Sequence, residues 1–414
     1  MESSEMLSGL RIAWVIPTLS HSGGVGPACW YAAEGAARLV DGQVTVVSLH
    51  EAPEARIDPT AGVQFVALGL VEDAAREFLR WLEANPQDLV ITNDVSRIET
   101  SFPYFPPTVA HVIQIHDSSH RYQDVAVRHS RYINGVLCVA HHIETQLREK
   151  LVEVGFQGVC GTVHNGAYFV PAPIRSKAEG ALRLLFTGNL DPLIKGVFDL
   201  VPILQRVVRA GVPVRLTVAG GYSDALEARF KKAKLDHLVT WIGRVPHETC
   251  YHLATESDVF LMTSRRESFG MVTIEAMSMG CVPLAYDIPS GNREIIEHNK
   301  SGFLLPLGDF NAWATTIKAL HDDREWLLTL SQGAMIRARE TFDNKRQAAR
   351  LVEFLEEVRT NAGRYPPERK RGYPQASIGS SGQSMYHKLP PHFRAWVRDT
   401  VGRYPRLSYW LINR

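Results

Sequence analysis

The sequence of 414 residues has few cysteines, no long apolar run and almost no net charge. Its five cysteines are scattered, so they fit neither a metal site nor a disulfide framework and favour a reducing compartment. No apolar run approaches the roughly 20 residues that a membrane-spanning helix needs, and the polar N-terminus lacks the pattern of a signal peptide. A net charge of +1 gives no overall attraction to nucleic acid. We therefore expect a cytoplasmic protein that binds no nucleic acid.

Short apolar runs alternate with helical patterns along most of the chain, which predicts parallel sheets covered by helices on both faces. The rhythm breaks over 168–181, where prolines and polar residues indicate a linker, and then begins again. We predict an α/β protein with two doubly wound domains, over residues 1–172 and 178–344. Ligands of such sheets bind outside the carboxyl ends of the strands. The expected strands are 11–17, 44–49, 88–93, 109–116, 134–140 and 161–165 in the first domain and 182–188, 214–221, 238–243, 258–264, 281–287 and 301–306 in the second.

The last part of the chain, residues 361–414, forms a basic and aromatic C-terminal extension. It holds ten Lys and Arg against two acidic residues, a net charge of +8, whereas the preceding residues carry −7. We predict a loosely structured linker over 361–381 and then a helical segment with apolar spacing. Two interpretations remain open: residues 390–414 lie on an anionic membrane surface, or they dock on the acidic body of the protein or on a partner subunit. The first would place the protein peripherally on the inner face of the cell membrane.

Two glutamates lie eight positions apart in the stretch RRESFGMVTIEAMSMG, residues 265–280. The stretch follows a buried strand, Gly270 permits a turn, and the next residues begin a helix whose free N–H groups favour an anion such as a diphosphate. Glu275 lies in the first turn of that helix, where its carboxylate can accept hydrogen bonds from ribose hydroxyls, and Glu267 lies in the loop before it. Two carboxylates that flank an anion site suit a nucleotide sugar.

Neighbouring loops strengthen this interpretation, because an isolated pair of glutamates more often only favours the helix dipole or contacts solvent. The stretch FTGNLDPLIKG, 186–196, places Lys195 at a helix start, where its charge can neutralise a diphosphate. The stretches WIGRVPHETC, 241–250, and YDIPSGNREII, 286–296, each place a turn after a strand at the same predicted edge.

Residues 238–309 carry WIGRV, SDVFLMTSRRESFGMVTIEAMSMGCVPLAYD and SGFLLPLGD in the order and spacing of a known family. Over roughly residues 10–345 the chain resembles the retaining nucleotide-sugar glycosyltransferases of family four. The resemblance implies the GT-B fold: two facing Rossmann-like domains with a cleft between them, the first for the acceptor and the second for the donor. A helix near 345–360 would return to the first domain. The implied reaction moves a sugar from a UDP- or GDP-sugar to a carbohydrate or lipid-linked acceptor, in glycan, polysaccharide or glycolipid assembly.

The resemblance also implies roles for individual residues. The catalytic candidates are Lys195, Glu267 and, at the strand end VIQIHD, His116. The donor-binding candidates are Gly23, Gly24, Asn189, Lys195, Arg244, Val245, Glu267, Ser268, Phe269, Gly270, Met271 and Glu275. The acceptor candidates follow strands of the first domain and are Asn93, Asp94, Arg97 and Asp117. The sequence has no acidic metal motif at the matching place, so we expect no metal and no cofactor beyond the nucleotide sugar.

Two positions depart from the family's pattern. Asn189 stands where the family usually has an arginine on the diphosphate, and Gly26 stands where an acidic residue is common. Arg183, Arg244 or Arg265 could supply the missing charge. Because of these departures, two alternatives remain beside a transferase. They are a nucleotide-sugar-binding partner subunit with weak catalysis and a nucleotide-sugar epimerase of the same fold.

Overall fold

The computed structural model describes residues 9–19, 24–50, 62–69, 71–176, 179–374, 394, 398 and 400–412. Among the expected site residues, Gly23 lies outside the described residues. Contacts within the chain define two compact units. Unit 1 comprises Met1–Tyr168 and Asp343–Gly382, and unit 2 comprises Phe169–Phe342 and Gln383–Arg414.

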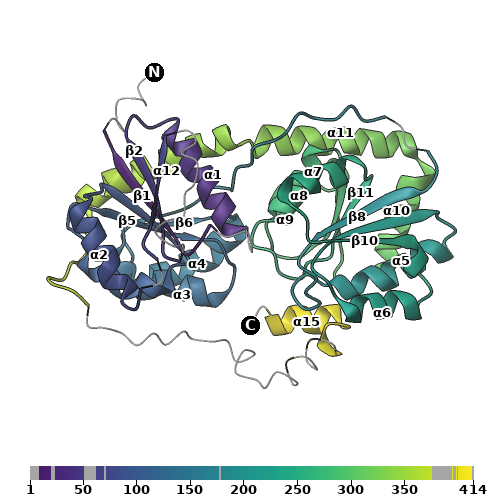
Figure 1. Ribbon diagram of the computed structural model, residues 1–414, viewed down its shortest axis with the longest axis horizontal. Coiled ribbons are helices and arrows are strands. Elements are labelled where there is room, and N and C mark those ends of the chain that lie inside the picture. Colours follow the sequence, from purple (N-terminus) through teal and green to yellow (C-terminus); the bar gives the residue numbers. More distant parts are fainter. Residues whose placement is uncertain are drawn as a thin grey trace. The chain divides into compact units, whose positions relative to one another are not determined.

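Unit 1 holds a seven-stranded sheet in the order β3-β2-β1-β4-β5-β6-β7, and every neighbouring pair is parallel. Helices lie on both faces of the sheet (Figure 1), as the alternating pattern predicted. The strands are β1 Arg11–Ile16, β2 Gln43–Ser48, β3 Val63–Ala67, β4 Leu89–Asn93, β5 Ala110–Ile115, β6 Gly135–Cys138 and β7 Val159–Thr162. The helices are α1 Val25–Ala37, α2 Ala74–Ala84, α3 His120–Arg128, α4 His141–Glu153 and α12 Asn344–Arg364, with 3-10 turns at Ser96–Tyr104 and Ser130–Tyr132.

The helix α12 belongs to unit 1, although it follows all the strands of unit 2 in the sequence. It packs closely on α1, where a Cβ added to Gly35 would lie 2.6 Å from the Cβ of Ala348. The side chain of Asn344 donates a hydrogen bond of 2.9 Å to the carbonyl of Tyr31. Leu355 and Val358 on α12 are fully buried. This contact of small residues explains how a late helix completes the first core.

Unit 2 holds a six-stranded parallel sheet in the order β10-β9-β8-β11-β12-β13. Its strands are β8 Leu182–Gly188, β9 Val214–Gly220, β10 Val239–Gly243, β11 Val259–Met262, β12 Val282–Tyr286 and β13 Phe303–Leu305. The helices around it are α5 Leu200–Arg209, α6 Asp224–Lys232, α7 His247–Thr255, α8 Met271–Ser278, α9 Asn292–Ile295, α10 Phe310–Asp322 and α11 Arg324–Thr341, with 3-10 turns at Val197–Asp199 and Asp236–Leu238. Because all strands run in one direction, the loops that follow them share one edge of the sheet.

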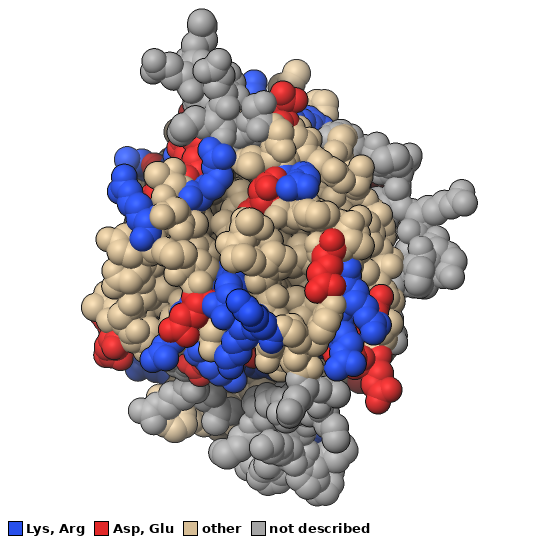
Figure 2. Space-filling model, turned by 90° about the vertical axis from the view of Figure 1, so that its left-hand side faces the viewer, with Lys and Arg blue, Asp and Glu red and all other residues tan. Residues whose placement is uncertain are grey.

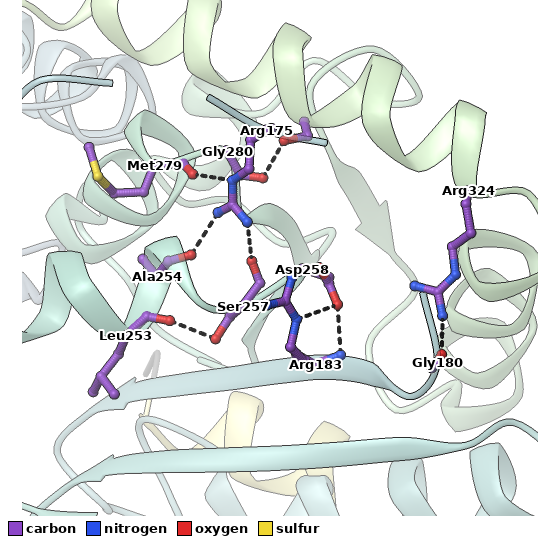
Figure 3. A network of polar contacts seen from close by, with 11 residues as sticks. Arg175, Gly180, Arg183, Leu253, Ala254, Ser257, Asp258, Met279, Gly280 and Arg324 are labelled. Carbon is purple, nitrogen blue, oxygen red and sulfur yellow. Dashed lines mark hydrogen bonds and ion pairs between the residues drawn. The ribbon is translucent and has the colours of Figure 1, made fainter. Parts of the chain in front are cut away.

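Arginines hold the opposite, amino edge of this sheet (Figure 3). Arg175 donates hydrogen bonds of 2.7, 2.8 and 2.7 Å to the carbonyls of Ala254, Ser257 and Met279. Arg183, at the start of β8, forms a two-pronged ion pair with Asp258, with the shorter contact at 2.6 Å. The segment that precedes β8 is therefore tied to the ends of α7 and α8 by charged hydrogen bonds.

The C-terminal extension is divided between the two units. The linker predicted over 361–381 begins later than expected, because α12 continues to Arg364; residues 365–374 have no helix or strand but belong to unit 1. The Arg369 guanidinium donates to the carbonyls of Tyr132 at 2.8 Å and Val109 at 3.1 Å. A later helix, α15 (Pro405–Ile412; yellow in Figure 1), docks on unit 2. Within the described part of the chain, no helix has the length and apolar character needed to cross a bilayer.

Candidate functional site

Four of the loops at the carboxyl edge of the sheet in unit 2 carry the candidate site. They follow β8, β10, β11 and β12 and cover residues 189–196, 244–246, 263–270 and 287–291. The strand β11 is fully buried, and the loop after it leads directly into α8. Gly270 ends this loop with φ +115°, and a Cβ there would lie 2.8 Å from Oδ1 of Asn292. This position therefore requires glycine, as the sequence predicted.

Lys195 and Glu267 lie together although 72 positions separate them in the sequence. The Lys195 Nζ donates to Glu267 Oε2 over 2.6 Å, and both side chains are partly buried. The Thr263 hydroxyl donates to the Lys195 carbonyl at 2.9 Å, which joins the two loops through the backbone as well. The sequence placed both residues at one edge of the sheet, and the structure brings them into direct contact.

Glu275 is paired with a residue that the sequence reasoning missed. Its Oε1 lies 2.8 Å from Nε2 of His247, the first residue of α7. The hydrogen bond to Glu275 raises the pKa of His247, because the carboxylate favours the charged imidazole. Glu275 itself is 7% exposed and is the fifth residue of α8, so it lies in the second turn and not in the first as predicted. The sequence could have indicated His247 by its position, because it comes two residues after Val245, which was expected to border the ligand.

The loop after β12 contributes a buried hydroxyl. The Oγ of Ser290 is buried and has no hydrogen-bond partner among the described residues. Gly291 follows it, and a Cβ at Gly291 would collide with the backbone of Phe269. The loop thus lies directly against the stretch between the two glutamates, and a ligand oxygen could satisfy the Ser290 hydroxyl. The sequence reasoning singled out this loop but not the serine.

The remaining donor candidates differ in exposure. Asn189 and Arg244 are exposed, while Val245, Ser268 and Met271 are half-buried. Phe269 is 3% exposed, and its ring packs edge-to-face on Phe342 with centroids 5.7 Å apart. Its side chain therefore serves the core, and its backbone is the part left to face a ligand.

Two of the three arginines expected to replace the missing charge pair with carboxylates of the protein instead. Arg183 pairs with Asp258 at the opposite edge of the sheet. Arg265 has no exposed surface and pairs with Asp199 at 2.6 Å, also inside the protein. The Arg183 guanidinium therefore lies away from the carboxyl edge, whereas Arg265 belongs to one of the loops there but is buried, bonded to Asp199 and to the carbonyl of Pro192. The position of Arg265 beside the motif did not reveal this burial. Arg244 remains as the exposed arginine on one of these loops.

In unit 1, His116 follows β5 and is 7% exposed. Its Nε2 lies 2.9 Å from Asn93 Oδ1 and 3.5 Å from Cys29 Sγ. The Asn93 amide nitrogen donates to the carbonyls of Val15 and Ile91, so its oxygen must face the ring and His116 Nε2 must carry the proton. Burial lowers the pKa of His116 to about 4. The imidazole is therefore neutral at neutral pH, with Nδ1 as an acceptor.

Asp94 lies on the same edge of unit 1, in a left-handed backbone conformation with φ +51°. Burial raises the pKa of Asp94 to about 7, and the negative charge of Asp117 adds a smaller effect in the same direction. Its Oδ1 is buried without a hydrogen-bond partner. The carboxyl group borders a small pocket of about 20 Å³, whose other polar lining residues include Ser96, Glu99, Gln114 and Arg121. A neutral or ionised carboxyl group in this place can bind a hydroxyl of a ligand.

The other candidates in unit 1 have structural partners. Asn93 has no exposed surface and holds His116, so it is a positioning residue and not an open acceptor contact. The Arg97 guanidinium donates to the carbonyl of Val71, away from the pocket. Asp117 accepts a 2.6 Å hydrogen bond from the Ser119 amide.

The described end of the glycine loop is the first turn of α1. Gly24 is exposed and is the N-cap residue of α1. A Cβ at Gly26 would lie 2.9 Å from the carbonyl oxygen of Thr18, which explains why no acidic residue stands there.

Residues 173–336 match the family model of glycosyl transferases group 1. The D-inositol 3-phosphate glycosyltransferase of Pseudarthrobacter chlorophenolicus is 31% identical over 217 residues, which are 49% of this chain and 50% of that protein. The chain thus spans about half the length of the curated relatives that it matches.

Solved structures show the fold over most of the chain. The sucrose-phosphate synthase of Thermosynechococcus elongatus is 17% identical, covers 84% of this chain and 99% of its own, and has a TM-score of 0.71. HepE of Anabaena, solved in complex with UDP-glucose, is 17% identical with the same coverage and a TM-score of 0.65. The protein has the GT-B fold. The predicted α/β architecture of two Rossmann-like units is confirmed.

Proposed function

We propose that the protein is a retaining glycosyltransferase that moves a sugar from a nucleotide diphosphate sugar to a hydroxyl of a carbohydrate or lipid-linked acceptor. The observation that carries the proposal is the arrangement around the start of α8. The pairs Lys195–Glu267 and His247–Glu275 flank the free N–H groups of one helix. This arrangement suits a ligand with an anion in the middle and hydroxyl groups at both ends.

Each group in unit 2 takes one part of the donor. Glu275, beside the loop after β10, would accept hydrogen bonds from the ribose, and Glu267 would bind the hydroxyls of the transferred sugar. Lys195 would neutralise the diphosphate, with exposed Arg244 nearby on the loop after β10. Charge grows on the leaving diphosphate in the transition state, and fixed cations and helix N–H groups stabilise it without rearrangement.

The acceptor would bind to unit 1, near His116 and the pocket beside Asp94. The neutral imidazole of His116 can accept a hydrogen bond from a sugar hydroxyl through Nδ1. In the reaction, the bond between the anomeric carbon and the donor phosphate oxygen breaks. The bond to the acceptor oxygen forms on the same face of the sugar, and the acceptor proton passes to the leaving phosphate. This route conserves the anomeric configuration and needs no nucleophile from the protein.

A donor panel tests the proposal. Thermal unfolding with UDP-, GDP-, ADP- and dTDP-sugars will identify the donor, because a ligand of the native state raises the unfolding temperature. We then expect release of nucleoside diphosphate in the presence of acceptor sugars, and a product whose anomeric configuration, measured by NMR, matches that of the donor. Donor binding without transfer would favour the partner subunit, an epimerised free sugar would favour the epimerase, and no donor binding would overturn the proposal.

We also propose that the protein associates peripherally with an anionic membrane surface through α15. Tyr404, Leu407 and Trp410 recur at every third residue and are 58%, 47% and 50% exposed, with Arg403 and Arg406 beside them. Aromatic and apolar side chains with arginines are typical of helices at the lipid interface. The face drawn in Figure 2 also carries a group of basic side chains near its lower centre, with acidic ones beside it.

Sedimentation with vesicles tests the membrane contact. We expect the full chain to sediment with anionic vesicles at low salt, and Leu407→Ser to reduce the bound fraction at least threefold. Tyr222→Ser is the matched control, because Tyr222 is 75% exposed elsewhere on unit 2. Equal binding to neutral vesicles, or an unchanged Leu407→Ser variant, would contradict the proposal.

A further inference from the structure

We propose that residues 400–412, the C-terminal brace, position the Lys195–Glu267 pair for the donor sugar. The brace is the last described segment of unit 2 and includes α15. This inference rests on the proposed donor site and adds a separate element to it. The observations that carry it are the contacts of Arg265, Arg266 and Gly402 with the two loops that hold the pair.

Arg265 joins three segments of the chain through one guanidinium. Its Nη1 donates to the carbonyl of Pro192 at 2.9 Å, and its Nη2 donates to Asp199 Oδ1 at 2.6 Å and to the carbonyl of Gly402 at 3.0 Å. The side chain has no exposed surface. Pro192 lies three residues before Lys195, and Arg265 lies two residues before Glu267. One buried cation thus links the brace to both halves of the ion pair.

Asp199 completes this buried cluster. Its second carboxylate oxygen accepts a hydrogen bond of 2.8 Å from the Tyr286 hydroxyl, and the residue is 1% exposed. Tyr286 is the last residue of β12, so the cluster is anchored in the sheet. If Arg265 lost one of its acceptors, a buried N–H group would have no hydrogen-bond partner, which costs free energy. The loops around Arg265 would then rearrange.

Arg266 makes a second contact with the brace. Its Nη1 donates to the carbonyl of Ile412 at 2.9 Å. Arg265 is bonded to Gly402, just before α15, and Arg266 is bonded to Ile412, the last residue of α15. Two consecutive residues of the motif therefore contact the brace at positions ten residues apart. Glu267 follows directly, and its backbone is fixed by this double contact.

Packing supports the same conclusion. A Cβ added to Gly402 would lie 2.5 Å from the carbonyl oxygen of Arg398, 3.0 Å from the Cβ of Pro192 and 3.3 Å from Cδ2 of Phe198. The backbone of the brace therefore touches the loop on both sides of Lys195. Ser408 has no exposed surface, and its hydroxyl donates to the carbonyl of Val401 at 2.6 Å, which fixes the bend before α15.

The brace should affect the two ends of the proposed donor site differently. Glu275 pairs with His247 at the start of α7, whereas the loops that carry Lys195 and Glu267 are both joined to the brace. Displacing the brace should therefore loosen the end of the site that holds the sugar and the diphosphate. The nucleoside end, held through Glu275, should change less.

Gly402→Val in the full chain tests the inference, since the added side chain would collide with the carbonyl oxygen of Arg398 and press on Pro192 and Phe198, which displaces the brace from the loop. We expect the affinity for the matching nucleotide sugar to fall at least tenfold, measured by titration calorimetry, and the affinity for the nucleoside diphosphate to fall less than threefold. Gly363→Val is the matched control, because a Cβ at Gly363 meets no atom within 4 Å. Equal losses for both ligands in a folded Gly402→Val variant, or no loss, would overturn the inference.

Hydrogen exchange on the wild-type chain decides the question even where the variant does not fold. Binding of the nucleotide sugar should slow amide exchange in residues 402–412 together with 263–270, and binding of the nucleoside diphosphate should slow the brace less. Unchanged exchange in 402–412 at saturating donor would contradict the inference. Failure of the wild-type protein to bind any nucleotide sugar would instead overturn the proposed function, so the two failures are distinguishable.

Discussion

The two units share one architecture but present opposite chemistry at the carboxyl edges of their sheets. In unit 1, His116 is kept neutral by burial, and the pKa of Asp94 is raised to about 7. In unit 2, the site consists of the pair Lys195–Glu267 and the pair Glu275–His247, where the pKa of the histidine is raised. The difference supports the proposal that unit 2 binds the charged donor and unit 1 the neutral hydroxyl groups of the acceptor.

A second contrast lies within unit 2. At the amino edge, Arg175 and Arg183 have their hydrogen bonds satisfied by carbonyls and by Asp258 (Figure 3), so they hold the architecture. At the carboxyl edge, Lys195 pairs with the partly buried carboxylate of Glu267, and the proposed diphosphate would add a second anionic partner. Positive charge thus holds the architecture on one edge and is available for the proposed donor on the other.

The largest expected effect is on the ionic site. Glu267→Gln should lower turnover roughly 1,000-fold, because it removes the charge that orients Lys195 and binds the donor sugar. Steady-state release of nucleoside diphosphate measures the loss. Glu256→Gln, on the opposite side of unit 2 at the end of α7, is the control and should keep wild-type turnover. If Glu267→Gln lowered turnover less than threefold, unit 2 would not hold the ionic site that distinguishes it from unit 1.

The second largest effect on turnover is expected at His116, the neutral histidine of unit 1. His116→Ala should lower turnover about 100-fold and change the donor affinity less than threefold, because the imidazole is expected to contact the reacting sugar or acceptor. Kinetics with varied donor concentration separate the two constants. His111→Gln is the control, because His111 is also buried and lies in β5. This variant should be less stable, but the turnover of the folded protein should stay unchanged. Equal turnover losses in both variants would make His116 a packing residue.

A stability measurement sharpens the account of unit 1. Because the pKa of Asp94 is raised in the folded state, its contribution to stability falls as pH rises from about 4 to about 7. Asp94→Asn keeps a residue that tolerates the left-handed backbone and removes this charge. We expect the variant to be more stable than wild type by about 1–2 kcal/mol at pH 8, after allowance for screening, and nearly equal at pH 4. Urea unfolding at both pH values provides the test, and a pH-independent difference would contradict it.

The smallest effect concerns His247. Its raised pKa means that the pair with Glu275 stabilises the protein fully below pH 6.5 and loses this contribution as pH rises through the higher folded value. His247→Gln should therefore lower the unfolding temperature slightly at pH 6 and not at pH 9. Because the imidazole is half exposed, the difference should be a few tenths of a kcal/mol. The opposite pH trend would show that the pair is not ionic.

The parallel sheets followed from the sequence because buried strands such as 258–264 read as continuous apolar runs between helices. The position of Lys195 and Glu267 at one edge of the sheet followed as well, since parallel strands bring their carboxyl ends together, but the ion pair between them did not. Three further features could not be predicted. The burial of Arg265 depends on Asp199 and Gly402, which are distant in sequence. The role of Asn93 depends on its side-chain partners, and the division of the C-terminal extension depends on contacts such as Arg369 with Tyr132.

The most direct test of the central claim is a calorimetric titration of Glu275→Gln and Glu267→Gln with the nucleoside diphosphate of the matching donor. The account predicts that Glu275→Gln loses at least tenfold in affinity, because a ribose contact is removed, and that Glu267→Gln loses less than threefold. A greater loss in Glu267→Gln than in Glu275→Gln would contradict the assignment of the two ends of the donor to the two glutamates.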